Sequence, residues 1–322
     1  MTGPVVIAGN LSLDDTITPD RAFLSAPGGD ALYASIAVRS WGVIPTLLTL
    51  VGEDYPEADL VRIAAAEIDV DHVRRTAGPT IHYRVSYTSD VDRIFEWISS
   101  PDRLILTSPV VADYRALAGA AWLHVAAMPI EAQEVGVAAA RAAGIPVSLD
   151  PHEEYIRGFE PRLATMVAGI TFMPSDLEAR LLFPDLDAGE GLEFGFAAAE
   201  RLDDWGPALT AIKLGPNGSV VRQAGRSVHV PATAVRVVDP TGAGDAYCGG
   251  FIAGWLATRS PEVAAGCGAV AAGEAIGTFG AFPSDPPGRQ ARFDRLVALL
   301  GDRADQGLLD AVRKQLWTGT AR

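Results

Sequence analysis

Short runs of apolar residues alternate along this chain with longer segments that place an apolar residue at every third or fourth position. Continuous apolar runs are typical of strands buried on both faces, and the longer segments are typical of helices that cover such strands. The pattern predicts an α/β fold with a mostly parallel sheet between helices, whose ligands bind beyond the carboxyl ends of the strands. The predicted strands are Val5–Ala8, Thr46–Val51, Trp122–Ala126, Val147–Leu149, Ile170–Phe172 and Ala208–Leu214, and the predicted helices are Ala31–Trp41, Glu57–Glu67, Glu131–Ala143, Asp176–Leu182 and Leu192–Asp204.

One region breaks this rhythm. Thr80–Tyr87 and Arg93–Ile98 alternate apolar and polar residues as strands do, and Ser89–Asp92 has the composition of a turn between them. Two strands alone are marginally stable, so we expect this insertion to pack against another part of the protein.

The C-terminal third is richer in glycine and alanine. Ala234–Val238 is β-branched and predicts a strand, and the apolar segment after Asp245 predicts a helix. The segment Val263–Phe282 is apolar, but five glycines and Glu274 interrupt it, so a buried helix is expected rather than a membrane span. From Arg292 onward the pattern predicts one or two amphipathic helices.

Composition narrows the possible functions. Of the 322 residues, 48% are hydrophobic and 20% charged, which predicts a folded protein with a large core. The formal net charge of −14 argues against nucleic acid or an anionic membrane as a partner. Cys248 and Cys267 lie in apolar segments without metal-ligand spacing, and no basic stretch precedes the first apolar run. These features predict a soluble, cytoplasmic protein.

The segment Val238–Tyr247 carries the most specific pattern. It places Gly242 and Gly244 between a predicted strand and a predicted helix, so the backbone there can turn sharply and approach a ligand closely. The free N–H groups at the start of that helix, those of Ala243, Gly244 and Asp245, favour an anion. A carboxylate beside such an anion site suits phosphoryl transfer, with Asp245 as the general base. A helix corner in which Asp245 only complements the helix dipole is the structural alternative.

The string Asp-Pro-Thr-Gly-Ala-Gly-Asp resembles the C-terminal signature of the PfkB/ribokinase family of sugar and nucleoside kinases, and other motifs follow in the family's order over roughly residues 5 to 282. The resemblance implies a ribokinase-like α/β domain over residues 1–302 with a small β lid near residues 78–108, followed by a helical extension over residues 303–322. It also implies ATP and Mg²⁺, a monovalent cation near Asp239 and Thr241, and a homodimer formed through the lid.

Two early motifs would hold the substrate. Asp14, after the first predicted strand, can accept hydrogen bonds from two sugar hydroxyls and matches the acid of the family's opening motif. Gly28, Gly29 and Asp30 resemble the family's Gly-Gly signature, and Asp30 is also a good helix cap. Tyr33 stands where many members have asparagine, which puts ribose recognition in doubt and favours a partly apolar wall.

Two later motifs would hold the nucleotide and metal. Lys213, Gly215 and Gly218 resemble the nucleotide loop, with Thr241 as a further nucleotide-binding residue; an ordinary turn between strands is the alternative. Glu178 resembles the glutamate that supports the water shell of Mg²⁺, although its helix begins with Ser175 where the family has asparagine. A serine-capped helix is the alternative there. His152 replaces another family asparagine, after Asp150 and Pro151.

The sequence therefore predicts an ATP-dependent kinase acting on a hydroxyl of a small sugar-like substrate. A nucleoside kinase of the same family and a catalytically silent sugar- or nucleotide-binding regulator remain open. A Rossmann oxidoreductase would need Gly-x-Gly-x-x-Gly after an early strand, and a P-loop enzyme would need Gly-x-x-x-x-Gly-Lys-Ser/Thr. The chain offers neither.

Overall fold

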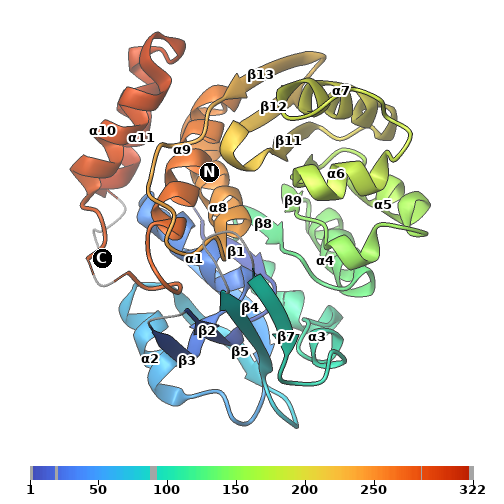
Figure 1. Cartoon of the computed structure of the whole chain (residues 1–322), viewed down its shortest axis with the longest axis vertical. Coiled ribbons are helices and arrows are strands. Elements are labelled where there is room, and N and C mark those ends of the chain that lie inside the picture. The colour runs from blue at the N-terminus through green and yellow to red at the C-terminus, as the bar shows by residue number, and fades with distance from the viewer. Residues whose placement is uncertain (1–2, 19–20, 88–92, 284, 319–322) are drawn as a thin grey trace.

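A large, mostly parallel sheet forms the centre of the molecule (Figure 1). The computed structural model describes residues 3–18, 21–87, 93–283 and 285–318. Seven neighbouring strands pair in parallel, and β12 and β13 add two antiparallel strands at one edge. In spatial order the nine strands are β13 (Arg226–Val230), β12 (Ser219–Gln223), β11 (Leu209–Lys213), β10 (Thr171–Phe172), β9 (Val147–Leu149), β8 (Trp122–Val125), β1 (Val5–Ala8), β4 (Pro45–Val51) and β5 (Asp69–Arg75). The mostly parallel sheet expected from the sequence is confirmed.

Successive side chains of a strand point to opposite faces of the sheet, and because both sets are apolar in strands such as β1, helices cover both faces. In β1, the side chains of Val6 and Ala8 join one core, while those of Val5 and Ile7 join another on the opposite face. The first core packs under α4, α5, α6 and α7, and the opposite face packs under α1, α2, α8 and α9. The helices are α1 (Asp30–Ser40), α2 (Glu57–Ala65), α3 (Arg103–Leu106), α4 (Ile130–Ala143), α5 (Glu160–Val167), α6 (Asp176–Leu182), α7 (Leu192–Leu202), α8 (Ala243–Thr258), α9 (Pro261–Ile276), α10 (Arg289–Leu300) and α11 (Gln306–Thr318).

The β insertion is larger than the sequence predicts. It is a four-stranded sheet in the order β3 (Ala22–Gly28), β2 (Ser12–Ile17), β6 (Ile81–Tyr87) and β7 (Arg93–Trp97), and the predicted turn lies outside the described residues. β2 and β6 pair in parallel, so two hairpins distant in sequence form one sheet. The ring of Phe23 stacks on that of Phe279 at 5.1 Å, which joins this sheet to the segment after α9.

The predicted strand Ala234–Val238 is wrong. These residues form no ladder, and the N–H groups of Val238 and Asp239 instead donate to the carbonyl of Ile276 at the end of α9. The chain leaves the sheet after β13, which is its edge, so this segment has no neighbouring strand to pair with.

The two C-terminal helices are confirmed, and α11 packs on the body of the protein. Leu309, Val312 and Leu316 are buried in the core beside α8. The side-chain amide of Gln315 donates to the carbonyls of Trp41 and Ala253. Within the described residues, no helix has the length and apolarity needed to cross a bilayer.

Candidate active site

The polar residues of the site lie at the carboxyl ends of neighbouring parallel strands. Asn10 follows β1, Asp150 follows β9, Ser175 lies beyond β10, and Lys213 ends β11. Because these strands are neighbours or near neighbours in the sheet, their ends form one edge, where open α/β sheets bind ligands.

The N-terminus of α8 separates two cavities at this edge. Thr241, Gly242 and Asp245 line one cavity of about 250 Å³, which reaches under the lid. Ala243 and Gly244 line the other, of about 140 Å³. One helical turn therefore presents its carboxylate to the first cavity and its backbone to the second. We refer to them as the lid cavity and the loop cavity.

Asp14 lies in the lid cavity as the sequence predicts, but on a lid strand rather than in a loop. The hydroxyl of Ser12 donates to its carboxylate at 2.7 Å. A Cβ on Gly28 would come within 1.8 Å of the same carboxylate, so the absence of a side chain at this position lets Asp14 take its place. Burial raises the pKa of Asp14 to about 6, with the negative charge of Asp239 as a further cause and the Ser12 hydrogen bond opposing the shift.

Asp30 is the second carboxylate of the lid cavity. The cap of α1 is Gly29, with a φ of 101°, so Asp30 stands one residue farther into the helix than a cap would. Its carboxylate accepts hydrogen bonds from the N–H groups of Asn10 at 2.6 Å and Ala31 at 2.5 Å. Burial raises its pKa well above the usual range, and the charge of Asp245 adds to this effect.

Tyr33 forms a wall of the lid cavity and fixes the shape of the α8 turn. Its side chain is 5% exposed. A Cβ on Gly242 would lie 2.2 Å from its ring, and Gly242 has a φ of 76°. Two features therefore require glycine at position 242: its backbone conformation and the close approach of the tyrosine ring.

Asp245 occupies the first turn of α8 and is the third carboxylate of the lid cavity. Burial raises its pKa; the charge of Lys213 opposes this shift and that of Glu178 adds to it. A carboxyl whose pKa is moved toward neutrality is suited to proton transfer.

His152 also lines the lid cavity. Its Nδ1 accepts a hydrogen bond from the backbone N–H of Glu154, and its ring meets that of Tyr155 edge-on at 5.4 Å. Burial lowers the pKa of the imidazole, which favours its neutral form. The Nδ1 acceptor then leaves the proton on Nε2, so the ring can act as a hydrogen-bond donor through that atom.

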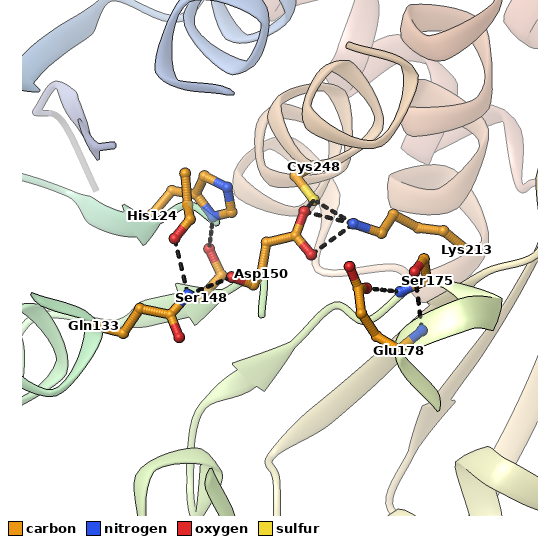
Figure 2. Close-up of polar contacts among 9 residues, drawn as sticks. His124, Gln133, Ser148, Asp150, Ser175, Glu178, Lys213 and Cys248 are labelled. Carbon is orange, nitrogen blue, oxygen red and sulfur yellow. Dashed lines mark hydrogen bonds and ion pairs between the residues drawn. The ribbon is translucent and has the colours of Figure 1, made fainter. Parts of the chain in front are cut away.

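Lys213 is held by a carboxylate to which sequence reasoning assigned no role. Figure 2 shows its Nζ between Asp150 and Cys248, at 2.5 and 2.6 Å from the two carboxylate oxygens and 3.8 Å from the sulfur. Burial alone would lower the pKa of Lys213, but Asp150 raises it far above the ordinary value, so the ammonium remains charged. Burial keeps Cys248 protonated by raising its pKa, and its thiol donates to Asp150 at 3.3 Å.

The lysine lies beside the helix turn that carries the predicted anion site. A Cβ on Gly244 would be 3.4 Å from its Nζ. A fixed positive charge is therefore next to the backbone of Gly244, at the wall of the loop cavity. This position suits an anionic group of a nucleotide.

Glu178 forms a capping box at the start of α6. Its carboxylate accepts from the N–H of Ser175, and the Ser175 hydroxyl accepts from the N–H of Glu178 (Figure 2). The serine-capped helix considered as the alternative is thus present. Burial raises the pKa of Glu178, while Lys213 opposes the shift, so the carboxylate is also near the charged cluster.

The loop cavity is lined by the Lys213–Gly218 segment, the start of α8 and the end of α9. Lys213, Gly215 and Gly218, the residues that the resemblance assigns to the nucleotide loop, line it together. The remainder of the wall is small or apolar and includes Ala232, Ala269, Ala272, Gly273 and Ile276. Small side chains leave room for a flat base between the loop and α9. Thr241, which the resemblance assigned to the nucleotide, lies on the side of the lid cavity instead.

Fold and site together define a phosphotransferase that acts on an alcohol group, and comparisons with known proteins give the family. Residues 8–287 match the model described as pfkB family carbohydrate kinase, and the chain belongs to this family. It is 28% identical to a cytidine kinase of Thermococcus kodakarensis over 86% of this chain and 97% of that protein. It is 26% identical to a fructokinase of Klebsiella pneumoniae over 81% of this chain and 87% of that protein.

A solved structure supports the fold. A putative ribokinase II from E. coli, in complex with ATP and Mg²⁺, superposes with a TM-score of 0.76 at 20% identity. The match covers 92% of this chain and all of that chain. Kinases of this family use ATP and bind small molecules.

Proposed function

We propose that this protein transfers the terminal phosphoryl group of ATP to a hydroxyl of a small, uncharged polyol. The observation that carries the proposal is the α8 turn, which presents the Asp245 carboxylate to the lid cavity and the Gly244 backbone to the loop cavity. A hydroxyl in the first cavity and a nucleotide in the second would meet across this turn.

Asp245 acts as the general base. It takes the proton of the substrate hydroxyl onto a carboxylate oxygen as that hydroxyl attacks, and its raised pKa suits this transfer. Mg²⁺-bound ATP supplies the phosphoryl group when it occupies the loop cavity. The N–H groups of Gly244 and Asp245 and the ammonium of Lys213 would stabilise negative charge there, because the first N–H groups of a helix lack intrahelical partners. The N–H of Ala243 would join them by exchanging its 3.4 Å hydrogen bond to the carbonyl of Pro240 for one to the phosphate. Glu178 would support the water shell of the metal.

The substrate is uncharged because the lid cavity is acidic. Asp14, Asp30 and Asp245 line it, and no lysine or arginine is among the described residues that do. Two acids can each accept hydrogen bonds from neighbouring hydroxyls, whereas an anionic substrate would meet like charges at short range.

A nucleoside is the second candidate. Tyr83 lies in the wall of the lid cavity, and its ring contacts Trp97 with centroids 4.4 Å apart. With Tyr33 and His152, this makes an aromatic wall on which a base could stack. The similarity to a cytidine kinase favours this candidate, since its match spans nearly the whole of that protein.

Two finer expectations remain proposals. A monovalent cation would bind near Asp239 and Thr241, where the Asp239 carboxylate accepts from the Thr241 N–H at 3.0 Å.

A homodimer would form through the lid, on which Leu24 and Ile94 are 63% and 53% exposed. Substitution of Ile94 by lysine should dissociate such a dimer in light-scattering measurements.

The test is ATP consumption with Mg²⁺ across neutral sugars, nucleosides and sugar phosphates, using wild type and Asp245→Asn. We expect turnover with one neutral class and a loss of roughly 1,000-fold in kcat in the variant, with little change in KM. Near-native turnover by Asp245→Asn would reject the base assignment. Binding without turnover of any compound would favour the silent regulator.

A further inference from the structure

Tyr33 lines a third cavity in addition to the lid cavity. The volume of this third cavity is about 340 Å³, and it is enclosed by α1, the end of α9, the start of α10 and the connection between α9 and α10, which runs past α1 (Figure 1). Tyr33, Ile36, Ala37 and Ser40 line it at the spacing of one helix face. Its size is within the range of small-molecule sites.

Most of the wall of this cavity is apolar. Ile68, Ala275, Phe282 and Pro286 contribute to it, and the guanidinium of Arg62 lies 4.5 Å from the centre of the Phe282 ring. This face favours a compact hydrophobic body such as a ring.

The polar part of the wall contains both charges. Among the described residues, Arg39, Arg289 and Arg292 line the cavity together with Glu67 and Glu274. Arg292 is fully engaged, since it donates to Glu274 at 2.8 Å and to two backbone carbonyls.

Arg39 is less completely bonded. It pairs with Glu67, which is itself 64% exposed, and its buried Nε has no hydrogen-bond partner in the described part of the chain. The hydrogen bond of Arg39 to Glu67 uses only its Nη2 group, so a ligand carboxylate at the cavity wall could accept from the rest of the guanidinium.

We propose that this cavity is a second binding site, for a small apolar molecule that carries a carboxylate. The body of the ligand would lie against α1 and Phe282, and the carboxylate near Arg39. The same Tyr33 ring borders the lid cavity and lies against Gly242, so the two sites share one wall. Occupancy would therefore change KM for the phosphoryl acceptor without competing with it.

Benzoate is a suitable probe, and benzyl alcohol is its uncharged counterpart. Saturation-transfer NMR on the whole protein should detect benzoate binding with a Kd of about 1 mM or below, and benzyl alcohol at least about fivefold more weakly. Because the coupling of two sites is reciprocal, saturating polyol should shift the Kd of benzoate by a limited factor that reaches a plateau, rather than displace benzoate competitively. Arg39→Lys, which retains the charge opposite Glu67 but loses the planar donor group, should weaken benzoate severalfold.

Ala275→Leu would fill the cavity from α9 and should abolish benzoate binding while the melting temperature stays near that of wild type. If this variant does not fold, Ile36→Phe fills the cavity from α1 instead. Undetectable benzoate binding to wild type, unchanged binding to a folded filled variant, or competitive displacement by polyol without a plateau would overturn the proposal. So would an unchanged KM at saturating benzoate. The binding measurements need no turnover, so they are separate from the test of kinase activity.

Discussion

The lid cavity and the loop cavity differ in the chemistry of their walls. On the lid side, three carboxylates and aromatic side chains from α1, α8 and the lid form the wall. On the loop side, most of the wall is glycine and alanine, with Thr233, Tyr247 and Ile276, and Lys213 is the charged side chain among the described lining residues. A side chain in a wall can be replaced by another side chain, whereas a backbone conformation that requires glycine tolerates few substitutions. This difference indicates why one fold can keep ATP while its members accept different polyols.

The largest loss of stability is expected when Lys213, the charged side chain among the described residues of the loop cavity, is replaced. Lys213→Met should leave the Asp150 carboxylate buried without its cation, and we expect about 3–5 kcal/mol lower free energy of unfolding. Chemical denaturation measures this. The double variant Lys213→Met/Asp150→Asn removes the charge as well and should recover most of the loss. A single variant as stable as wild type would show that the pair does not act as a buried unit.

A matched pair of glycines, one from each cavity, gives the second effect. Gly242→Ala would place a Cβ 2.2 Å from the Tyr33 ring at a φ of 76°, and should lower the free energy of unfolding by about 3 kcal/mol. Gly215→Ala shares a positive φ, 54°, but has open space around it, so about 1 kcal/mol is expected. Equal losses in the two variants would mean that the tyrosine contact does not matter.

The acidity of the lid cavity predicts discrimination by charge. For an accepted polyol and the same molecule with a carboxylate replacing a non-reacting hydroxyl, kcat/KM should differ by roughly 100-fold in favour of the neutral compound. Steady-state kinetics with the two compounds at one ionic strength measures this. Equal kcat/KM would contradict the proposal of an uncharged substrate.

The smallest effect concerns pH. The pKa of Asp14 is raised from 3.8 to about 6, chiefly by burial, so folding favours its protonated form. The stability due to this group is fully present below pH 3.8 and is lost as the pH rises through about 6. Relative to Asp14→Asn, wild type should lose about 2 kcal/mol in free energy of unfolding between about pH 4 and pH 7. A constant difference across this range would place Asp14 in a more polar environment.

Sequence patterns predicted most of the parallel sheet and its helices, because buried strands such as β1 are continuous apolar runs. The edge strand β5 was missed, since its sequence is mostly polar and charged. The lid was predicted only in part. β2 contains Asp14 and Asp15 in succession, and this polar pair interrupts the alternation of apolar and polar residues that predicts a strand. Its parallel partner β6 is distant in the sequence. Ala234–Val238 failed in the opposite way, since its β-branched residues indicate a strand but the sheet has already ended.

In the site, motifs of consecutive residues were easier to predict than contacts between residues distant in the sequence. The helix turn at Gly242–Asp245 is contiguous, so one segment of sequence specifies it. The contact between Asp150 and Lys213 joins the ends of two strands separated by β10, and a single sequence does not indicate such pairings. The carboxylate of Asp30 likewise bonds to Asn10 through a fold contact rather than a local motif.

The parallel pairing of β2 with β6 has a consequence for how the protein folds. The two hairpins of the lid are separated in sequence by α1, β4, α2 and β5, so the lid sheet cannot form until that unit has brought them together. Long-range pairings carry a high loop-closure entropy and form late. Amide protons that are hydrogen-bonded between β2 and β6 should therefore exchange with solvent faster than those hydrogen-bonded between β1 and β4. The lid sheet should open locally while the large sheet stays folded.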